Sequence, residues 1–150
     1  MEHKLTKISQ IGFVVEDLDA VTAWMKKIFG ADPVIAKAPE RERKYYGGEG
    51  DFEAEIAFYD FANIQLEFVK PIKGSSIWQD FLNEGKKGLH HIRFSVDDYN
   101  GIVSEMKEKG IELSMEGVSV KNVPGLRWGY FDSEDKLPFI FEIFNELEVS

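Results

Sequence analysis

The chain has 150 residues, of which 43% are hydrophobic and 13% aromatic, so it is long enough to bury the core of one domain. It contains no cysteine, which excludes disulfides, thiolate metal ligands and cysteine nucleophiles, and its net charge of −9 disfavours nucleic acid as a partner. No apolar run reaches the ~20 residues that span a bilayer, and the first residues do not resemble a signal peptide. We therefore expect a cytoplasmic protein that does not bind membranes.

The first half of the chain begins with an alternating apolar pattern over residues 8–15, which predicts a strand with one apolar face. Asp17 is a typical helix N-cap, and Gly30 ends the helical spacing of apolar residues that follows it. The charged, glycine-rich segment 39–50 predicts a mobile loop. Three more strands are expected in this half, at about residues 33–37, 52–61 and 64–70.

A short amphipathic helix at about residues 75–85 is expected to link the two halves, because Ser76 and Gln79 form a capping box. The second half then repeats the plan of the first, with a strand at 89–96 and a helix capped by Asp98. Three further strands are expected near residues 111–120, 126–132 and 138–145.

The two halves also match residue by residue. Ile11, Phe13, Val15 and Asp17 recur 81 residues later as Ile92, Phe94, Val96 and Asp98. A tandem duplication explains these matches better than chance does. We therefore predict a single α+β domain over residues 1–150, built from two βαβββ modules at about 7–71 and 88–146.

Strand alternation predicts that four polar residues share one face of the sheet. Gln10 and His91 point away from the apolar faces of the two first strands, and Glu67 and Glu142 do so in the last strands. A carboxylate within such apolar strands is costly to bury unless it is paired or bound to a cation. The set therefore predicts one divalent metal ion, and its oxygen and imidazole ligands suit Zn²⁺, Ni²⁺, Co²⁺, Mn²⁺ or Fe²⁺.

Each of these residues also has a simpler interpretation when it is taken alone. Gln10 could be polar lining, His91 a hydrogen-bonded core histidine, and either glutamate a salt-bridged edge residue. Their equivalent positions in the two halves favour the metal site instead. His90 falls in the register of the apolar face and His3 lies in the N-terminal tail, so neither is expected to be a ligand.

Arg93 and one cluster of basic residues are candidate anion sites. Arg93 alternates onto the same face as His91, where it could hold a substrate carboxylate or form a salt bridge to Glu67 or Glu142. The cluster Lys37, Arg41, Arg43 and Lys44 is more typical of a solvated loop than of an anion-binding lip.

The stretches Gln10–Asp19, Gly88–Ile92 and Phe141–Ile143 resemble the vicinal oxygen chelate superfamily, which includes glyoxalase I, methylmalonyl-CoA epimerase, extradiol dioxygenases and bleomycin resistance proteins. The resemblance spans residues 7–145. It implies that the modules form one curved mixed sheet, with the metal site on its concave face. It also implies a homodimer.

Within the superfamily, the linker helix followed by Gly-Leu-His-His-Ile, and Leu66-Glu67 before Lys70-Pro71, look most like methylmalonyl-CoA epimerase. Those epimerases usually have histidine at the first ligand position, whereas the Gln/Glu/His/Glu set resembles one class of glyoxalase I. They also tend to carry a second acid before the fourth strand, for which Asp51 or Glu53 is the candidate here. No glutathione-binding set can be identified.

The resemblance implies a metal-dependent epimerase or isomerase that removes a proton next to the carbonyl of a small acyl thioester or 2-oxo acid. The metal would stabilise the enediolate, with Glu142 as the base and Glu67 as a ligand that also shuttles a proton. The alternatives are a glyoxalase I-type lactoylglutathione lyase and a non-enzymatic small-molecule binding protein. An extradiol dioxygenase, which normally presents two histidines and one glutamate, ranks lowest. We expect the segment 39–51 to shape the substrate pocket.

Overall fold

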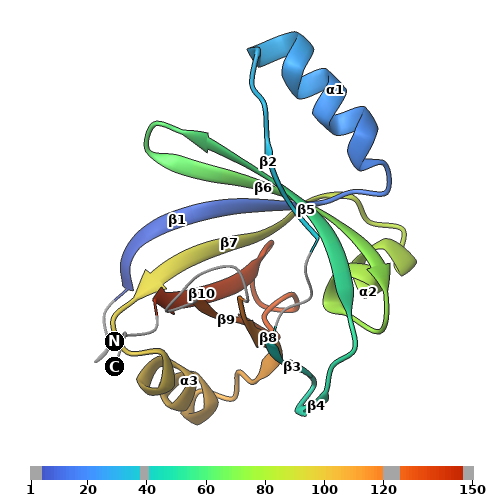
Figure 1. The fold of residues 1–150 in the computed structure, drawn as a ribbon. Helices are drawn as coiled ribbons and strands as arrows, with labels where there is room; N and C mark the ends of the chain where they lie inside the picture. Colours follow the sequence, from blue (N-terminus) through green and yellow to red (C-terminus); the bar gives the residue numbers. More distant parts are fainter. Residues whose placement is uncertain (1–4, 38–40, 120–125, 147–150) are drawn as a thin grey trace.

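The computed structural model describes residues 5–37, 41–119 and 126–146, which form one strongly curved sheet with three helices around it (Figure 1). Its strands follow the order β2-β5-β6-β1-β7-β10-β9-β8-β3-β4. The elements are β1 (Leu5–Val14), α1 (Leu18–Phe29), β2 (Val34–Ala36), β3 (Arg41–Tyr45), β4 (Gly48–Glu49), β5 (Glu53–Phe61), β6 (Ile64–Lys73), α2 (Ile77–Asn83), β7 (Gly88–Val96), α3 (Tyr99–Glu108), β8 (Leu113–Val118), β9 (Leu126–Phe131) and β10 (Ile140–Glu146).

The centre of the sheet is formed by the first and last strands of the two halves. β1 pairs antiparallel with β7, parallel β6 flanks β1 on one side, and parallel β10 flanks β7 on the other. The remaining pairs are antiparallel, so the sheet is mixed and the predicted α+β class is confirmed. This topology places residues from both halves of the chain on four adjacent strands.

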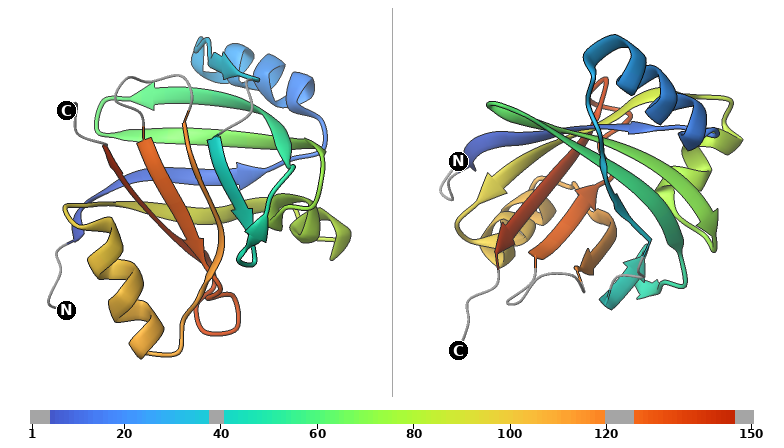
Figure 2. Two further views of the ribbon diagram at one scale, coloured as in Figure 1. Left: turned by 60° about the horizontal axis from the view of Figure 1, so that its bottom comes forward. Right: turned by 45° about the horizontal axis from the view of Figure 1, so that its top comes forward.

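Helices α1 and α3 cover the convex side of the sheet (Figure 2). The side chains of Asp17 and Asp98 cap them, each accepting a hydrogen bond of 3.0 Å from a backbone N–H in the first turn. α1 packs through Leu18 and Met25 on the β5–β6 side, and α3 packs through Ile102 and Met106 against β10. The apolar faces of the strands are therefore covered as the alternation predicts.

Helix α2 closes one end of the concave side. Its Trp78 ring lies 5.6 Å from that of Phe52 and 6.1 Å from those of Trp128 and Tyr130. These aromatic rings fill that end of the curve with packed apolar volume. None of the helices in the described ranges is long and apolar enough to cross a membrane.

The prediction of a mobile loop over residues 39–50 is wrong for its described part. Residues 41–49 form the β3–β4 hairpin, and β3 continues the sheet by pairing with β8. Tyr45 anchors this hairpin, because its hydroxyl donates a 2.5 Å hydrogen bond to Asp80 Oδ2 of α2. The basic residues Arg41, Arg43 and Lys44 thus lie on a strand and not on a solvated loop.

Candidate metal centre

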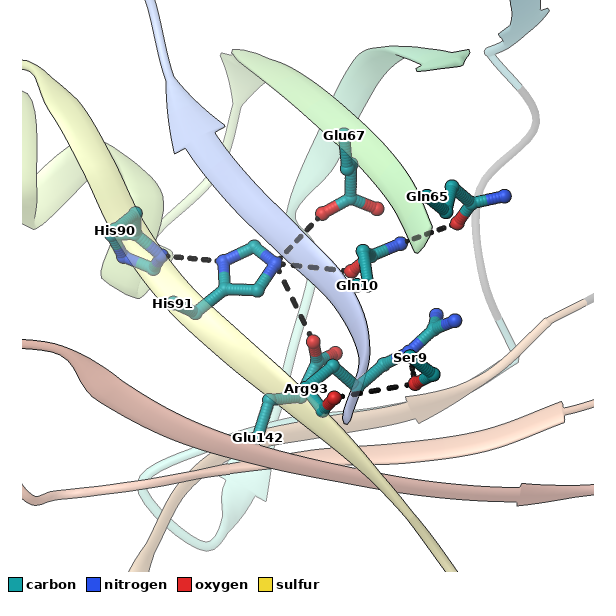
Figure 3. A network of polar contacts seen from close by, with 8 residues as sticks. All are labelled: Ser9, Gln10, Gln65, Glu67, His90, His91, Arg93 and Glu142. Atoms are coloured by element: carbon teal, nitrogen blue, oxygen red, sulfur yellow. Dashed lines mark hydrogen bonds and ion pairs between the residues drawn. The ribbon is translucent and has the colours of Figure 1, made fainter. Parts of the chain in front are cut away.

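The structure brings the four residues predicted as metal ligands together on the concave face (Figure 3). The Nε2 atom of His91 lies 3.0 Å from Glu67 Oε1, 3.2 Å from Gln10 Oε1 and 3.4 Å from Glu142 Oε1. All four side chains are buried, and the most exposed of them, Glu67, has a relative exposure of 6%. Three oxygens from three strands therefore meet one imidazole nitrogen.

Strand register explains how His91 reaches Glu67 across an intervening strand. Gly12 of β1 is the pairing partner of Glu67 on β6 and of His91 on β7. A β-carbon added to Gly12 would lie 2.0 Å from the His91 ring, so the imidazole occupies the space that any other residue would fill. Sequence reasoning missed Gly12, although a glycine inside a strand often marks such a close approach.

The convergence leaves buried oxygens without partners. His91 Nε2 carries one proton at most, which can serve one of the three oxygens. Within the described chain, Glu67 Oε1 and Glu142 Oε1 are buried without a hydrogen bond. Burial raises the pKa of Glu142 to about 7; the charges of His91 and Arg93 oppose this shift and that of Glu67 adds to it. Such a pair of carboxylates is unfavourable unless a cation joins it.

The donor set fits a first-row divalent ion. Two donors about 2.1 Å from one ion are about 3.0 Å apart at right angles and about 3.4 Å apart in a tetrahedron. The three distances to His91 Nε2 span this interval. Among the described residues no three His, Asp or Glu side chains form a ready-made metal cluster, and the fourth candidate donor is the amide oxygen of Gln10.

The expectation that His90 lies on the opposite face from His91 is wrong. Gly12 pairs with His91 but the next residue, Phe13, pairs with Leu89, so His90 sits in a β-bulge. The bulge turns His90 inward, where its Nδ1 lies 2.9 Å from His91 Nδ1. His3, the other histidine that was not expected to be a ligand, lies outside the described residues.

His90 is suited to hold the His91 ring in place. Burial lowers its pKa well below the usual value, and the neighbouring His91 lowers it further, so His90 is neutral. A neutral His91 that binds a metal through Nε2 carries its proton on Nδ1, and His90 Nδ1 can accept that proton in a hydrogen bond. The ring of His90 packs against Phe81 and Tyr130, which fixes its own orientation.

A cavity of about 290 Å³ lies over the donor set. Its walls are mainly apolar, and its polar lining includes both glutamates and Arg93. It is lined by Val34, Ala36, Ile56, Phe58, Asp60, Gln65, Glu67, Trp78, Arg93, Ser119, Leu126, Trp128, Tyr130, Glu142 and Phe144. This is the arrangement of a small-molecule site, with a few convergent polar groups in an apolar pocket.

The described part of the segment expected to shape this pocket does not line it. None of the described residues 41–51 is part of the cavity wall, because the β3–β4 hairpin lies beyond β8 at the sheet edge. The two candidates for a second acid are also absent from the wall. Asp51 is exposed, and Glu53 forms an ion pair of 3.6 Å with Lys73. Among the described residues, the cavity wall contains one carboxylate besides Glu67 and Glu142, namely Asp60.

Arg93 lies on the predicted face and lines the cavity. Its guanidinium carbon is 3.8 Å from the centroid of the Phe144 ring, and its Nε donates a 3.1 Å hydrogen bond to Ser9 Oγ. Within the described chain it forms no ion pair with Glu67 or Glu142. The side chain is thus held by stacking and by Ser9 at the edge of the carboxylate pair.

Comparisons with known proteins agree with this architecture. The human mitochondrial methylmalonyl-CoA epimerase is 28% identical over 117 residues, which cover 77% of this chain and 61% of the human protein. The chain thus spans about three fifths of the length of that relative. The ethylmalonyl-CoA/methylmalonyl-CoA epimerase of Cereibacter sphaeroides is 25% identical over 112 residues, covering 74% of this chain and 76% of that protein.

Solved structures share the fold. Methylmalonyl-CoA epimerase from Mycobacterium tuberculosis superposes with a TM-score of 0.69 at 17% identity, covering 99% of this chain and 93% of that one. A variant of the Streptomyces coelicolor enzyme in complex with 2-nitronate-propionyl-CoA gives 0.68 at 20% identity, covering 98% and 99%. Residues 9–128 also match a family profile over more than half of the chain. The chain belongs to the Glyoxalase/Bleomycin resistance protein/Dioxygenase superfamily.

Proposed function

We propose that this protein is a metal-dependent epimerase that removes and returns a proton next to the carbonyl of a small acyl thioester. The observation that carries the proposal is the pair of buried glutamates, Glu67 and Glu142, whose unpaired oxygens meet at His91 Nε2 beside an apolar cavity. Relatives named methylmalonyl-CoA epimerase support this reaction, and the neighbour with 2-nitronate-propionyl-CoA supports a CoA ester as the substrate.

The residues Gln10, Glu67, His91 and Glu142 would hold one divalent ion, Zn²⁺, Ni²⁺, Co²⁺, Mn²⁺ or Fe²⁺. When bound, the ion would supply a Lewis acid that polarises the substrate carbonyl and lowers the cost of removing the α-proton.

Epimerisation requires a proton to leave one face of a carbon and to return on the other. Glu67 on β6 and Glu142 on β10 approach His91 from opposite sides of β1 and β7, so they can act on opposite faces of a substrate bound between them (Figure 3). We assign the base to Glu142 and the second proton transfer to Glu67. The apolar walls, which include Trp128 and Phe58, keep water from competing for the proton.

Arg93 would hold a carboxylate of the substrate. It lines the same cavity as Glu142, and its stacking on Phe144 leaves the guanidinium edge able to form hydrogen bonds with a carboxylate. A thioester of a dicarboxylic acid, which keeps one free carboxylate for Arg93, meets this requirement.

One observation favours a second candidate, a glyoxalase I-type lyase. The first ligand position in this chain is Gln10, whose amide oxygen faces His91 Nε2. The resulting Gln/Glu/His/Glu set resembles that of one class of glyoxalase I. Both reactions begin with removal of a proton next to a carbonyl, so they share the chemistry of the site and differ in the substrate.

Proton exchange in deuterated water tests the proposal. We expect the protein, loaded in turn with each of the five metals, to replace the α-proton of methylmalonyl-CoA with deuterium, as followed by NMR. Glu142→Gln should slow the exchange on the order of 10³-fold, whereas Glu16→Gln, an exposed control, should leave it unchanged. Conversion of the hemithioacetal of methylglyoxal and glutathione without exchange of the thioester would favour the lyase. No reaction of either substrate with any metal would refute both.

A further inference from the structure

A row of three polar side chains leads from the edge of the cavity to the donor set. Asp60 on β5 pairs directly with Gln65 on β6, and Gln65 pairs directly with Gln10 on β1. Asp60 and Gln65 line the cavity, whereas Gln10 is fully buried beneath it. The three side chains therefore lie side by side across three adjacent strands.

Hydrogen bonds link the three side chains, and in each of them the donor lies on the side of the donor set and the acceptor on the side of Asp60. Gln65 Nε2 donates to Asp60 Oδ1 at 3.2 Å, and Gln10 Nε2 donates to Gln65 Oε1 at 2.7 Å. The remaining end of the Gln10 amide, its oxygen, lies 3.2 Å from His91 Nε2 (Figure 3). The NH₂ group of each amide thus points toward Asp60, and its oxygen points toward His91.

The chemistry of Asp60 explains this direction. An ionised carboxylate only accepts hydrogen bonds, so the neighbouring amide of Gln65 must turn its NH₂ group toward it. The oxygen of Gln65 then faces Gln10, which can satisfy it only with its own NH₂ group. One acceptor at the edge of the sheet therefore determines the orientation of two amides in succession.

Without this row, the two buried carboxylates would favour the reverse orientation of Gln10. The unpaired carboxylate oxygens of Glu67 and Glu142 would attract the NH₂ group of an amide that was free to turn. An NH₂ group facing inward offers no lone pair to a cation, so the centre would lose one of its four donors.

We infer that Asp60 and Gln65 are positioning residues that turn the amide oxygen of Gln10 toward the metal centre. The part of this inference that concerns metal affinity rests on the proposed function. The orientation of the amide does not, because it can be measured in the metal-free protein.

Two single variants should break this row of hydrogen bonds, and one double variant should restore it. Asp60→Asn replaces the acceptor by a group that both donates and accepts, so it no longer sets a direction. Gln65→Met removes the hydrogen bonds to Asp60 and Gln10 and keeps a side chain of similar size. The double variant Asp60→Asn with Gln65→Glu keeps the net charge of the wild type, and its new carboxylate at position 65 accepts from both neighbours. That variant should hold Gln10 in its original orientation.

The first measurement is the nuclear Overhauser effect of the Gln10 side-chain NH₂ protons in the metal-free protein, assigned by their loss in Gln10→Met. In the wild type and the double variant these protons should be close to protons of residue 65 and not to those of the His91 ring. In Asp60→Asn they should become close to the His91 ring. If the Gln10 amide kept its wild-type orientation in both Asp60→Asn and Gln65→Met, the inference would be overturned.

The second measurement is the affinity for Co²⁺, by calorimetry and by the visible absorption of the bound ion. Asp60→Asn and Gln65→Met should weaken binding on the order of 10-fold and change the spectrum, and the double variant should recover both. Unchanged affinity in both single variants, or no recovery in the double variant, would overturn the positioning role. If the wild type bound no Co²⁺, the proposed metal centre would fail, and the Overhauser data would still decide the orientation.

Discussion

Single residues decide whether the four donors can meet, and Gly12 is the most restrictive of them. The alternation of β1, β6, β7 and β10 places Gln10, Glu67, His91 and Glu142 on one face. Only the absence of a side chain at Gly12 lets the His91 ring cross β1 toward Glu67. The site therefore depends on a residue that contributes no functional group.

Gly12→Ala should disrupt the site and destabilise the fold. The added β-carbon would lie 2.0 Å from the His91 ring, so the imidazole must move away from Glu67. We expect a loss of roughly 1–3 kcal/mol in the free energy of unfolding, measured in urea, together with weaker Co²⁺ binding.

Gly48→Ala is the matched control, because a β-carbon at that strand position meets its nearest atom, the Tyr45 carbonyl oxygen, at 3.8 Å. It should leave Co²⁺ affinity unchanged. Equal Co²⁺ affinity in the Gly12 variant and the control would show that the close approach of His91 to β1 is not needed.

For single residues, the sequence predicts which side chains share a face of the sheet. It misses residues whose roles depend on a β-bulge or on a cross-strand neighbour. Period-two alternation places the four polar residues on one face, even though the pairing of β1 with β7 shifts register next to Gln10 and His91. It assigns His90 to the wrong face, because the β-bulge in β7 interrupts the alternation. It also says nothing of Gln65, whose role follows from its cross-strand neighbours.

Among the elements, the β3–β4 hairpin differs most from expectation. Its residues are charged and glycine-rich, and β3 is held by pairing with β8, which lies far along the chain. Local sequence patterns do not reveal that pairing partner, so the sequence alone predicts a loop. The helices and other strands have local signals, such as the caps Asp17 and Asp98, and their predicted positions agree with the structure to within a few residues.

Tyr45→Phe should weaken the hairpin without affecting the donor set. The substitution removes the hydroxyl that donates to Asp80 and leaves the carboxylate without this partner. We expect a loss of about 1 kcal/mol in the free energy of unfolding and faster amide exchange in β3. Tyr46→Phe is the control, since Tyr46 is exposed. A loss in the control as large as that in the Tyr45 variant would contradict this role of the Asp80 contact.

The whole molecule is a mixed, curved sheet whose four central strands come from both halves of the chain, so neither half alone contains the complete donor set. Membership of the superfamily agrees with the resemblance seen in the sequence. The homodimer, the cytoplasmic location and the division into two modules stay predictions.

Binding of one metal ion by residues from both halves is the central claim, and calorimetric titration of the stripped protein with Co²⁺ tests it most directly. We predict one ion per chain for the wild type and for the exposed control Glu16→Ala. His91→Ala and Glu142→Ala should each weaken binding by at least about 100-fold, because each removes a donor. Unchanged stoichiometry and affinity in these two variants, or no binding by the wild type, would contradict the account.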